Sequence, residues 1–404
     1  MTRPSFPVLT LVLAGLTTMG ALGIDLFLPA TEAVGREFGT DSAGVQVTLA
    51  AFSIGFGIGQ FAHGPLSDRF GRRPALIGSF MVLIAAALAA AFAPDLEALA
   101  ACRFVVGVSA AAGVTVGRAI VRDLFAREAA ARLLSYMMMI AGIGPIAFPI
   151  AGGQLVVAFG WQSTFLFMAG YVGVLVAVFA WLIPETLPRK NPDALHPVGL
   201  FLACREVMRS RTFRAYAACN CFTMVGLFAF LTASPAVLIE AMGETPDRYG
   251  YDFAIAVSAM IVAAMAGGRL VVRIGIDRMV LVGAWIALAA GASMAGLALS
   301  GVATVAAVIA PIALFLTTFG LVVPGATAAA LTPFPQIAGI AASLLGFIQQ
   351  CVAVATTLII AALGATQTVM AVTVLVAGAG VLVSFLALVV PARRQTRVAP
   401  EAAR

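Results

Sequence analysis

The sequence predicts an all-α membrane protein in which twelve membrane-spanning helices form two six-helix bundles. Hydrophobic residues make up 62% of the 404 residues and charged residues only 10%, against about 45–50% and about 25% in soluble domains. Apolar runs of spanning length recur along the whole chain, and one basic, proline-containing segment divides them six and six. Because a spanning helix needs about 20 apolar residues, the chain has room for about twelve spans and for little outside the membrane.

We expect each apolar run to form one helix. The first run is too long for the core of a signal peptide and lacks a clear cleavage site, so we interpret it as the first spanning helix. The twelve expected spans lie at about residues 8–30, 44–64, 74–93, 97–121, 133–157, 163–184, 213–240, 251–272, 279–299, 303–329, 337–363 and 367–390.

The basic residues predict the orientation of these helices. Of the 24 basic residues, 21 fall on one side of the membrane, Arg36 and Arg248 fall on the other, and Arg103 lies within a helix. Cytoplasmic loops of membrane proteins are enriched in Lys and Arg, so we expect this Arg-rich side and both termini to be cytoplasmic. The net charge of +6 therefore reflects topology, and no nucleic-acid partner is expected.

Two ionisable residues lie well inside the predicted spans, Asp25 in the first helix and Arg103 in the fourth. At the rise of an α-helix, both lie roughly 8–9 Å below the outer edge of the membrane, and Gln46 in the second helix is near enough in depth to hydrogen-bond either. Ionisable residues at membrane depth are functional candidates by default. The alternative is a static buried ion pair that fixes packing.

Two segments in the first half of the sequence are rich in glycine and proline. The second helix runs into GPLSDRFGRRP at residues 64–74, a helix-connecting loop that could anchor the protein to acidic lipid. The fifth helix contains GPIAFPIAGG at residues 144–153. Small residues of this kind allow close helix packing in lipid, and prolines are tolerated in spanning helices.

The longest break between apolar runs predicts the domain organisation. It divides the chain into an N-terminal bundle at 1–184, a cytoplasmic linker at 185–212, a C-terminal bundle at 213–390 and a cytoplasmic tail at 391–404. The motif at residue 64 recurs 204 residues later, at 268–277, with Gly, Leu, Arg and Gly at equal spacing but with Val272 in place of Asp68. Each copy follows the second helix of its half, which indicates an internal duplication.

Together these features resemble the major facilitator superfamily, and the resemblance covers the whole chain, including the helix count, the duplication and the linker. It implies a conformational latch at the cytoplasmic ends of the two halves, in which Asp68 interacts with Arg72, with Asp123 at the end of the fourth helix, and with the N-terminal end of the eleventh helix. The latch residues implied in this way are Gly64, Asp68, Arg69, Gly71, Arg72, Arg73 and Asp123. The alternative is that this segment is only a topology anchor.

The glycines of the fifth helix look like the antiporter motif of this superfamily's drug exporters. The match is at Gly144, Pro149, Gly152 and Gly153, and the departures are Ser135 and Phe148, where the family pattern has glycine. Close packing alone is the alternative explanation. Further segments resemble the bicyclomycin and chloramphenicol resistance (Bcr/CflA) branch of drug:proton antiporters: Gly23-Ile-Asp25, Arg122-Asp123-Leu124, Pro184-Glu185-Thr-Leu187 and Ser234-Pro235.

The resemblance implies efflux of small amphipathic drug-like molecules across the bacterial inner membrane in exchange for protons. As the ionisable residues at membrane depth, Asp25 and Arg103 are the candidates for proton coupling. The alternative is a transporter of the same fold for a sugar, an amino acid or a nucleoside. Two histidines and no shared nucleophile or metal constellation argue against an enzyme. We expect no cofactor, no metal and no ATP hydrolysis, and a monomer whose partners are substrate, proton and lipid bilayer.

The residues of the substrate cavity are the least determined by sequence. Polar residues inside spans and adaptable Met or Phe side chains are candidates, although such residues more often serve packing. The candidates are Gln46, Asn220, Met138, Phe222 and Gln349.

Overall fold

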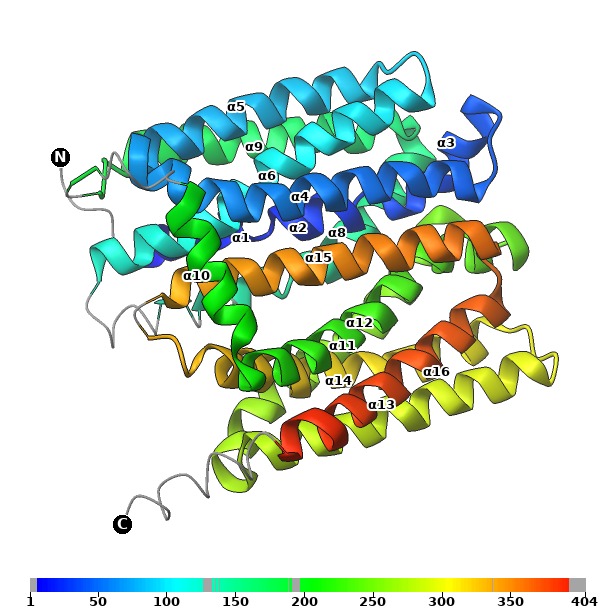
Figure 1. The fold of residues 1–404 in the computed structure, drawn as a ribbon. Coiled ribbons are helices and arrows are strands. Elements are labelled where there is room, and N and C mark those ends of the chain that lie inside the picture. The colour runs from blue at the N-terminus through cyan, green and yellow to red at the C-terminus, as the bar shows by residue number, and fades with distance from the viewer. Residues whose placement is uncertain are drawn as a thin grey trace, which may run out of the picture. The chain divides into compact units, whose positions relative to one another are not determined.

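The computed structural model describes residues 6–125, 133–134, 136–137, 139–187, 189–190, 197–335 and 337–391, and within them it contains helices and no strand (Figure 1). In that part of the chain, 11 helices are long and apolar enough to cross a membrane. A bent helix pair at the N-terminus brings the number to 12 if the pair is counted as one span. The predicted all-α fold with twelve membrane helices is therefore confirmed.

The helices group into two compact units. The first comprises Met1–His196 together with Glu244–Ala254, and the second comprises Pro197–Gly243 together with Ile255–Arg404. The first unit thus contains the helices of the predicted N-terminal bundle and also a short segment from the second half of the sequence. The helices of the first unit are α1 Phe6–Thr17, α2 Met19–Asp25, η1 Leu28–Ala30, α3 Thr31–Phe38, α4 Ser42–Phe70, α5 Arg72–Ala91, α6 Leu96–Leu124, α8 Gly144–Phe159 and α9 Gln162–Leu182.

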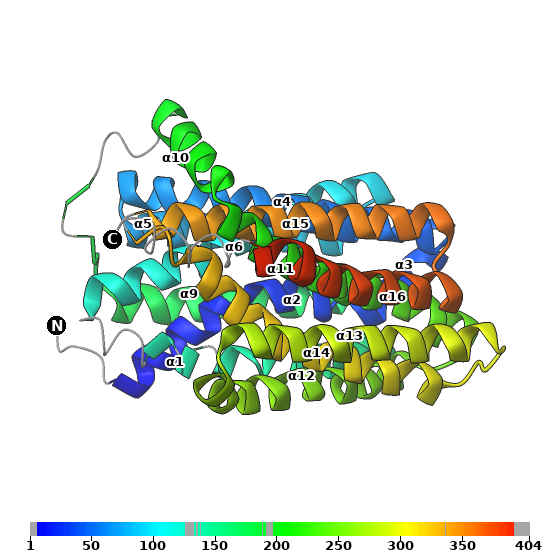
Figure 2. The same cartoon turned by 60° about the horizontal axis from the view of Figure 1, so that its bottom comes forward.

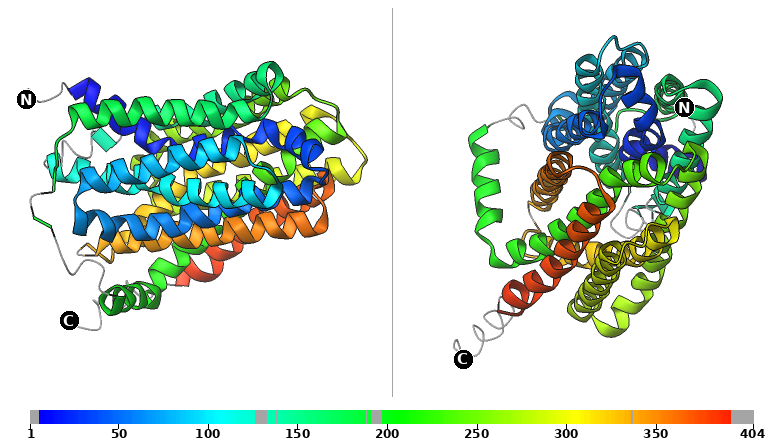
Figure 3. Two further views of the ribbon diagram at one scale, coloured as in Figure 1. Left: turned by 90° about the horizontal axis from the view of Figure 1, so that it is seen from above. Right: turned by 90° about the vertical axis from the view of Figure 1, so that its right-hand side faces the viewer.

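Glycines allow α4 and α6 to pack backbone against backbone, and Figure 3 shows these two helices side by side. A Cβ at Gly55 or Gly59 would overlap the carbonyl oxygens of Phe104 or Val108 on α6, and a Cβ at Gly107 would overlap that of Phe52 on α4. Small residues are the usual means of such close approach in membranes. As a result, side chains of α4 reach the part of α6 that carries Arg103.

The first predicted span is not one straight helix. It breaks at Thr18, and the helical segments on either side meet at an angle of 46° (Figure 2). The hydroxyls of Thr17 and Thr18 donate to the carbonyls of Ala14 and Gly15, at 2.7 and 2.8 Å. Threonine hydroxyls that bond to the preceding turn bend helices, which gives the break a physical cause.

The expected loop at residues 64–73 is also mostly helical. α4 continues to Phe70, and α5 begins at Arg72, so that Gly71 alone separates them. Gly71 has φ 110°, a conformation that residues with a Cβ rarely adopt. The connection is therefore a one-residue turn that fixes the direction of the side chains on both sides of it.

The second unit has its own helical packing. Its elements are α10 Pro197–Arg209, α11 Arg211–Pro235, η2 Ala236–Ala241, most of α12 Pro246–Ile274, α13 Ile276–Leu299, α14 Val305–Leu331, α15 Ala338–Leu363, α16 Gln367–Ser384 and η3 Phe385–Val389. α13 packs against both α14 and α16, as Figure 2 shows. α10 occupies much of the predicted linker and packs against α11 and α15, with Val207 fully buried. Residues 188 and 191–196 of the linker and 392–404 of the tail lie outside the described residues.

Candidate functional site

Arg103 lies on α6 and is fully buried in the first unit. Its guanidinium lies 4.2 Å from the centre of the Phe27 ring and 5.2 Å from that of Phe52. These distances suit cation–π attraction, which strengthens when the cation is desolvated. Nη1 donates to the carbonyl of Gly23 at 2.7 Å, and Nε donates a longer bond of 3.4 Å to the carbonyl of Thr48.

The carbonyl of Gly23 is available to Arg103 because α2 ends there. The Phe27 amide donates to Ile24 at 3.1 Å, one residue short of its α-helical partner, so the Gly23 oxygen is left at a helix end. Helix ends leave carbonyls that need other donors. Arg103 supplies one of them and so fixes the end of the helix that carries Asp25.

Asp25 is 94% buried, with 6% of its surface exposed. Among the residues that the structure describes, it makes no ion pair and no hydrogen bond with Arg103. The two residues do share a depth, since Arg103 bonds to Gly23, two positions before Asp25. The static ion pair that the sequence left open is therefore not formed here, because the guanidinium bonds to backbone carbonyls and packs on aromatic rings instead. Gln46 is buried on the neighbouring helix α4.

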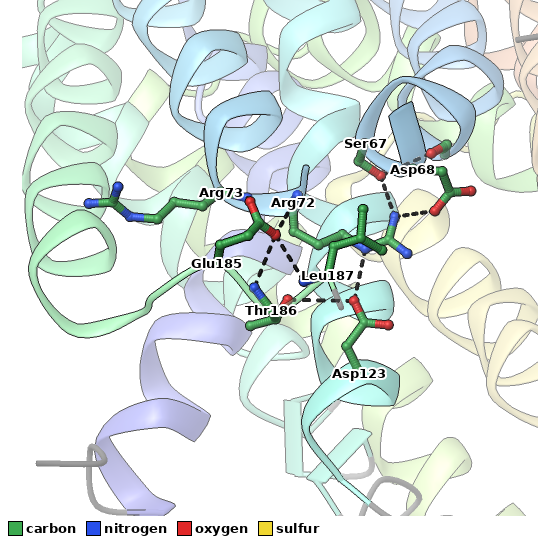
Figure 4. A network of polar contacts seen from close by, with 9 residues as sticks. Ser67, Asp68, Arg72, Arg73, Asp123, Glu185, Thr186 and Leu187 are labelled. Atoms are coloured by element: carbon green, nitrogen blue, oxygen red, sulfur yellow. Dashed lines mark hydrogen bonds and ion pairs between the residues drawn. The ribbon is translucent and has the colours of Figure 1, made fainter. Parts of the chain in front are cut away.

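A second polar cluster lies at the Arg-rich end of the first unit and centres on Arg72 (Figure 4). Arg72 forms ion pairs with Asp68 at 2.5 Å and with Asp123 at 2.9 Å, and its Nη1 also donates to the Ser67 hydroxyl at 2.7 Å. Its side chain is 9% exposed, whereas that of Asp68 is 42% exposed. The guanidinium therefore joins the ends of α4 and α6, and Asp68 is the more open of its two carboxylate partners.

Glu185, just beyond α9, completes this cluster (Figure 4). Its carboxylate accepts hydrogen bonds from the backbone amides of Arg72 at 2.9 Å and Arg73 at 3.2 Å, the first two residues of α5. It also accepts from the amides of Thr186 and Leu187, at 3.0 and 2.9 Å. The first amides of a helix have no partner within the helix and favour a negative charge. Glu185 thus caps α5 from a position 113 residues away in the sequence.

These amides also set the acidity of Glu185. Partial burial alone would raise the pKa of the carboxyl, but the hydrogen bonds from the amides of Leu187, Arg72, Arg73 and Thr186 outweigh it and hold the pKa below its ordinary value of 4.5. The group is therefore a carboxylate at neutral pH, as its capping geometry requires.

The other predicted latch residues take different positions. Arg73 donates from Nη2 to the carbonyl of Ala180 at 2.8 Å and so joins α5 to α9. Arg69 is exposed and lies over the ring of Phe70 at 5.5 Å, apart from the ion pairs. Gly64 lies within α4, and a Cβ there would make only an ordinary contact with Thr115. The structure therefore brings Asp68, Arg72, Arg73 and Asp123 together but gives Gly64 and Arg69 no place in the cluster.

The glycines of the motif in α8 are sites of close backbone approach. A Cβ at Gly152 would overlap the carbonyl of Leu26, next to Asp25, and a Cβ at Gly153 would overlap the carbonyl of Pro246 in the α12 segment of the same unit. The approach is reciprocal, since a Cβ at Gly250 would lie 2.5 Å from the carbonyl of Pro149. The motif thus links the helix of Asp25 to the first turns of α12.

Gly144 and Phe148, two further positions of this motif, pack on each other. A Cβ at Gly144 would lie 3.0 Å from the Phe148 ring. That ring in turn makes an edge contact with Tyr171, with centres 6.0 Å apart. Phe148, which departs from the family pattern, therefore fills space between α8 and α9.

The substrate candidates of the second unit do not form one cluster. Asn220 is fully buried on α11 and donates to the Thr327 hydroxyl at 3.4 Å, while its Oδ1 has no hydrogen-bond partner in the described part of the chain. Phe222 lies against α16, where a Cβ at Gly380 would overlap its ring. Gln349 is half-buried on α15. Met138 lies outside the described residues.

Sequence reasoning missed Glu185 and Ser67 as members of the Arg72 cluster. The one available signal for Glu185 was the Pro-Glu-Thr-Leu segment, which the resemblance singled out without giving it a partner. Nothing in the sequence distinguishes Ser67 from other hydroxyl residues near helix ends.

Comparison with known proteins gives the family. Residues 13–357 match the Major Facilitator Superfamily. The bicyclomycin resistance protein homolog of Haemophilus influenzae is 30% identical over 343 residues, which cover 84% of this chain and 85% of the relative. The multidrug resistance protein D of Escherichia coli is 27% identical, with coverage of 84% and 85%, and a chloramphenicol resistance protein of Pseudomonas aeruginosa is 26% identical, with coverage of 83% and 80%.

Solved structures agree on the fold. The human organic anion transporter MFSD10 superposes with a TM-score of 0.72 at 17% identity, over 96% of this chain and 100% of the other. A POT family transporter superposes with a TM-score of 0.76 at 12% identity, over 96% of both chains. The resemblance first seen in the sequence motifs is therefore confirmed, and the chain belongs to the major facilitator superfamily, with relatives among the bicyclomycin, chloramphenicol and multidrug resistance proteins.

Proposed function

We propose that this protein exports small amphipathic drug-like molecules across the bacterial inner membrane in exchange for protons. It works as a monomer without cofactor, with both termini in the cytoplasm. The observation that carries this proposal is Asp25 at the end of a broken helix, a buried carboxyl group that has no counter-ion among the residues that the structure describes. The names of the curated relatives supply the class of substrate.

Asp25 has the environment that a proton carrier needs. A charged carboxylate that leaves water without a counter-ion pays a desolvation penalty of several kcal/mol, so the arrangement seen here suits the protonated form. The ionised form requires water or a positive donor within reach. A movement of α2 that opens Asp25 to one side of the membrane, and then to the other, would load and release the proton in turn.

Arg103 can provide that positive donor. Its Nη2 has no hydrogen-bond partner in the part of the chain that is described, and its Nη1 already holds the helix that carries Asp25. A small shift of α2 would let the carboxylate take up the free N–H. Arg103 would then stabilise Asp25 after the proton has left and lose that contact when the proton returns.

Asp68 and Arg72 are the moving parts of the proposed latch. Arg72 is held by Asp123 in a largely buried ion pair, whereas Asp68 is half-exposed. Asp68 is therefore the carboxylate that can exchange partners as the protein changes state, and Glu185 keeps the start of α5 in place while it does so.

The substrate contacts remain those that the sequence proposed, with Asn220 the strongest candidate. An amide oxygen that is buried without a donor costs about 1–3 kcal/mol, and a hydroxyl or amide group on a substrate would remove that penalty. A site with one acid and one base in the first unit favours neutral amphipaths over dications.

The test is drug transport in inside-out vesicles with an imposed pH difference, compared between the wild type and Asp25→Asn. We expect the variant to lose proton-driven accumulation of a neutral phenicol but to keep exchange of labelled for unlabelled drug. Asp95→Asn is the matched control, because Asp95 caps α6 through the Ala98 amide and asparagine is also a good cap. Accumulation by Asp25→Asn at the wild-type level would show that another group carries the proton. Accumulation of sugars, amino acids or nucleosides instead of drugs would overturn the substrate class.

A further inference from the structure

The helix α10, Pro197–Arg209, runs across the direction of the spanning helices. It packs against α11 and α15, and Figures 1 and 3 show that it crosses them near the ends where they begin. The change of direction takes place at Ser210, where the backbone is extended and the hydroxyl caps α11 by accepting from the Phe213 amide at 3.3 Å. Since α11 and α15 are membrane spans, α10 runs along the membrane surface at the Arg-rich end of the unit. The proposed transport cycle does not use it.

One side of α10 is buried, and the side next to it is apolar but exposed. Val207 is fully buried and belongs to one apolar cluster with Phe213 of α11, and Cys204 is partly buried against that cluster. Phe201 and Met208 are 68% and 42% exposed. They are seven residues apart and therefore lie on the same side of the helix, about 100° round from Val207. The second unit covers the first of these sides and leaves the other open.

The remaining sides of α10 carry charge. Arg205 and Arg209 are exposed, and they lie about 160° round the helix from the buried side. Neither forms an ion pair within the part of the chain that the structure describes. Glu206, also exposed, lies about 160° from Met208. The exposed surface of α10 thus passes from apolar through basic to acidic, with Leu202 as an apolar residue, 52% exposed, between the basic and acidic sides.

A lipid surface is the partner that fits this arrangement. Amphipathic helices with basic polar faces lie in the plane of the membrane interface, with their apolar side chains at the level of the upper acyl chains. Both the direction of α10 and the order of its exposed sides suit that position. The charge selects the type of lipid, since residues 205–214 contain four arginines and one glutamate. Basic clusters next to a spanning helix attract anionic lipids, and guanidinium groups pair well with phosphate.

We propose that α10 is a membrane-surface helix that binds anionic phospholipid of the leaflet at the Arg-rich end. Phe201 and Met208 lie among the acyl chains, Arg205 and Arg209 bind the headgroup phosphates, and Glu206 faces water. The lipid surface holds α10 against the start of α11, which it adjoins through Ser210. This role does not depend on which solute the protein transports.

The first test compares the depth of two sides of α10 in the full-length protein in nanodiscs. Phe201→Trp and Glu206→Trp each add one tryptophan to the three of the chain. The added fluorescence is followed as phospholipid with bromine on its upper acyl chain replaces ordinary phospholipid. We expect loss of most of the fluorescence added by Phe201→Trp and little loss of that added by Glu206→Trp, the matched control on the same helix. Equal quenching of the two, or quenching of neither, would overturn the proposal.

The second test measures the contribution of charge. Amide hydrogen exchange of residues 197–209 is compared in phosphatidylcholine nanodiscs with and without phosphatidylglycerol. An arginine near an anionic surface contributes ~1 kcal/mol, which is about fivefold in an equilibrium constant, so two should slow exchange about 25-fold in the wild type. The slowing should disappear in the double variant Arg205→Gln with Arg209→Gln and persist when both residues are replaced by lysine. Arg36→Gln, which removes an exposed arginine from α3, is the control and should keep it.

Three outcomes of the exchange measurement would overturn the proposal. One is no effect of phosphatidylglycerol on the wild type, and another is an equal effect on the wild type and the double glutamine variant. The third concerns a free anion. If inorganic phosphate added to phosphatidylcholine nanodiscs slows exchange as much as phosphatidylglycerol does, the arginines bind soluble phosphate and the lipid assignment is wrong. The quenching test decides the question independently if the double glutamine variant fails to fold.

Discussion

The capping of α5 by Glu185 predicts a measurable and pH-dependent loss of stability in Glu185→Ala. The variant removes hydrogen bonds to the amides of Arg72 and Arg73 at the start of α5 and to those of Thr186 and Leu187. Loss of a helix cap costs about 0.5–2 kcal/mol. Because Glu185 is exposed, we discount the charged hydrogen bonds for solvent screening and expect a loss in the lower half of that range, about 0.5–1 kcal/mol.

That loss should appear in the melting temperature. For a unit of this size, 1 kcal/mol corresponds to about 2–4 °C, so Tm in detergent micelles should fall by about 1–4 °C. Glu185→Gln, which keeps one acceptor oxygen but loses the charge, should fall by about half as much. Glu206→Gln is the control, because Glu206 is exposed on α10 and makes no hydrogen bond or ion pair with any residue in the described part of the chain.

The pH dependence gives the sharper test. Since the folded pKa of Glu185 lies below its ordinary value of 4.5, the carboxylate stabilises the folded protein fully above that pH. The stabilisation is lost as the pH falls through the lower, folded value. The Tm difference between wild type and Glu185→Gln should therefore be constant from pH 7 to about 5.5 and shrink below pH 4.5. A difference that stays the same at pH 3.5, or that is absent at pH 7, would refute the capping role.

Three further changes test other parts of the first unit. Asp68→Asn should retain folding and drug binding but lose most transport, measured as efflux from cells and binding to purified protein; wild-type efflux would leave residues 64–73 as a topology anchor. Gly153→Val would press a side chain into the carbonyl of Pro246 and should lower stability by about 1–3 kcal/mol, whereas Gly78→Val, where a Cβ meets no atom within 4 Å, should not. Gly23→Ala would overlap the ring of Phe52 beside Arg103, so drug-coupled proton release, measured with a pH dye, should fall even where the variant is expressed and binds drug.

The membrane fold is predictable from the sequence because its cause is local. Each span is a run of apolar residues, and a bilayer leaves such a run few conformations other than a helix. Asp25 and Arg103 were identifiable for the same reason, since a charge within an apolar run stands out. The break at Thr18 was not, because two threonines within an apolar run are compatible with a straight helix. Their hydroxyls bend this one by bonding to the turn before them.

Contacts between residues that lie far apart in the chain could not be predicted from the sequence. Arg103 and Asp25 lie at the same depth in the membrane, which suggested that they would pair. Depth alone, however, does not determine to which acceptor the guanidinium donates. Here the end of α2 offers the Gly23 carbonyl and two aromatic rings flank the charge. The role of Glu185 depends on a one-residue turn at Gly71, where the sequence suggested a longer loop. Only that tight turn brings the first amides of α5 to the end of α9.

The two copies of the internal repeat show which part of the motif is structural and which part is chemical. Gly71 and Gly275 both have positive φ, 110° and 80°, and in both copies the next helix begins at the following residue. The charges differ, since the positions of Arg72 and Arg73 are taken by Ile276 and Asp277. Asp277 accepts a hydrogen bond from the Tyr216 hydroxyl at 2.5 Å, so in the second unit this turn is tied to α11. Both halves of the chain therefore share the glycine turn, whereas the ion pairs of Arg72 are a feature of the first half. If the latch works through these charges, substitutions at residues 276 and 277 should leave transport largely intact where the matching substitutions at Arg72 and Arg73 abolish it.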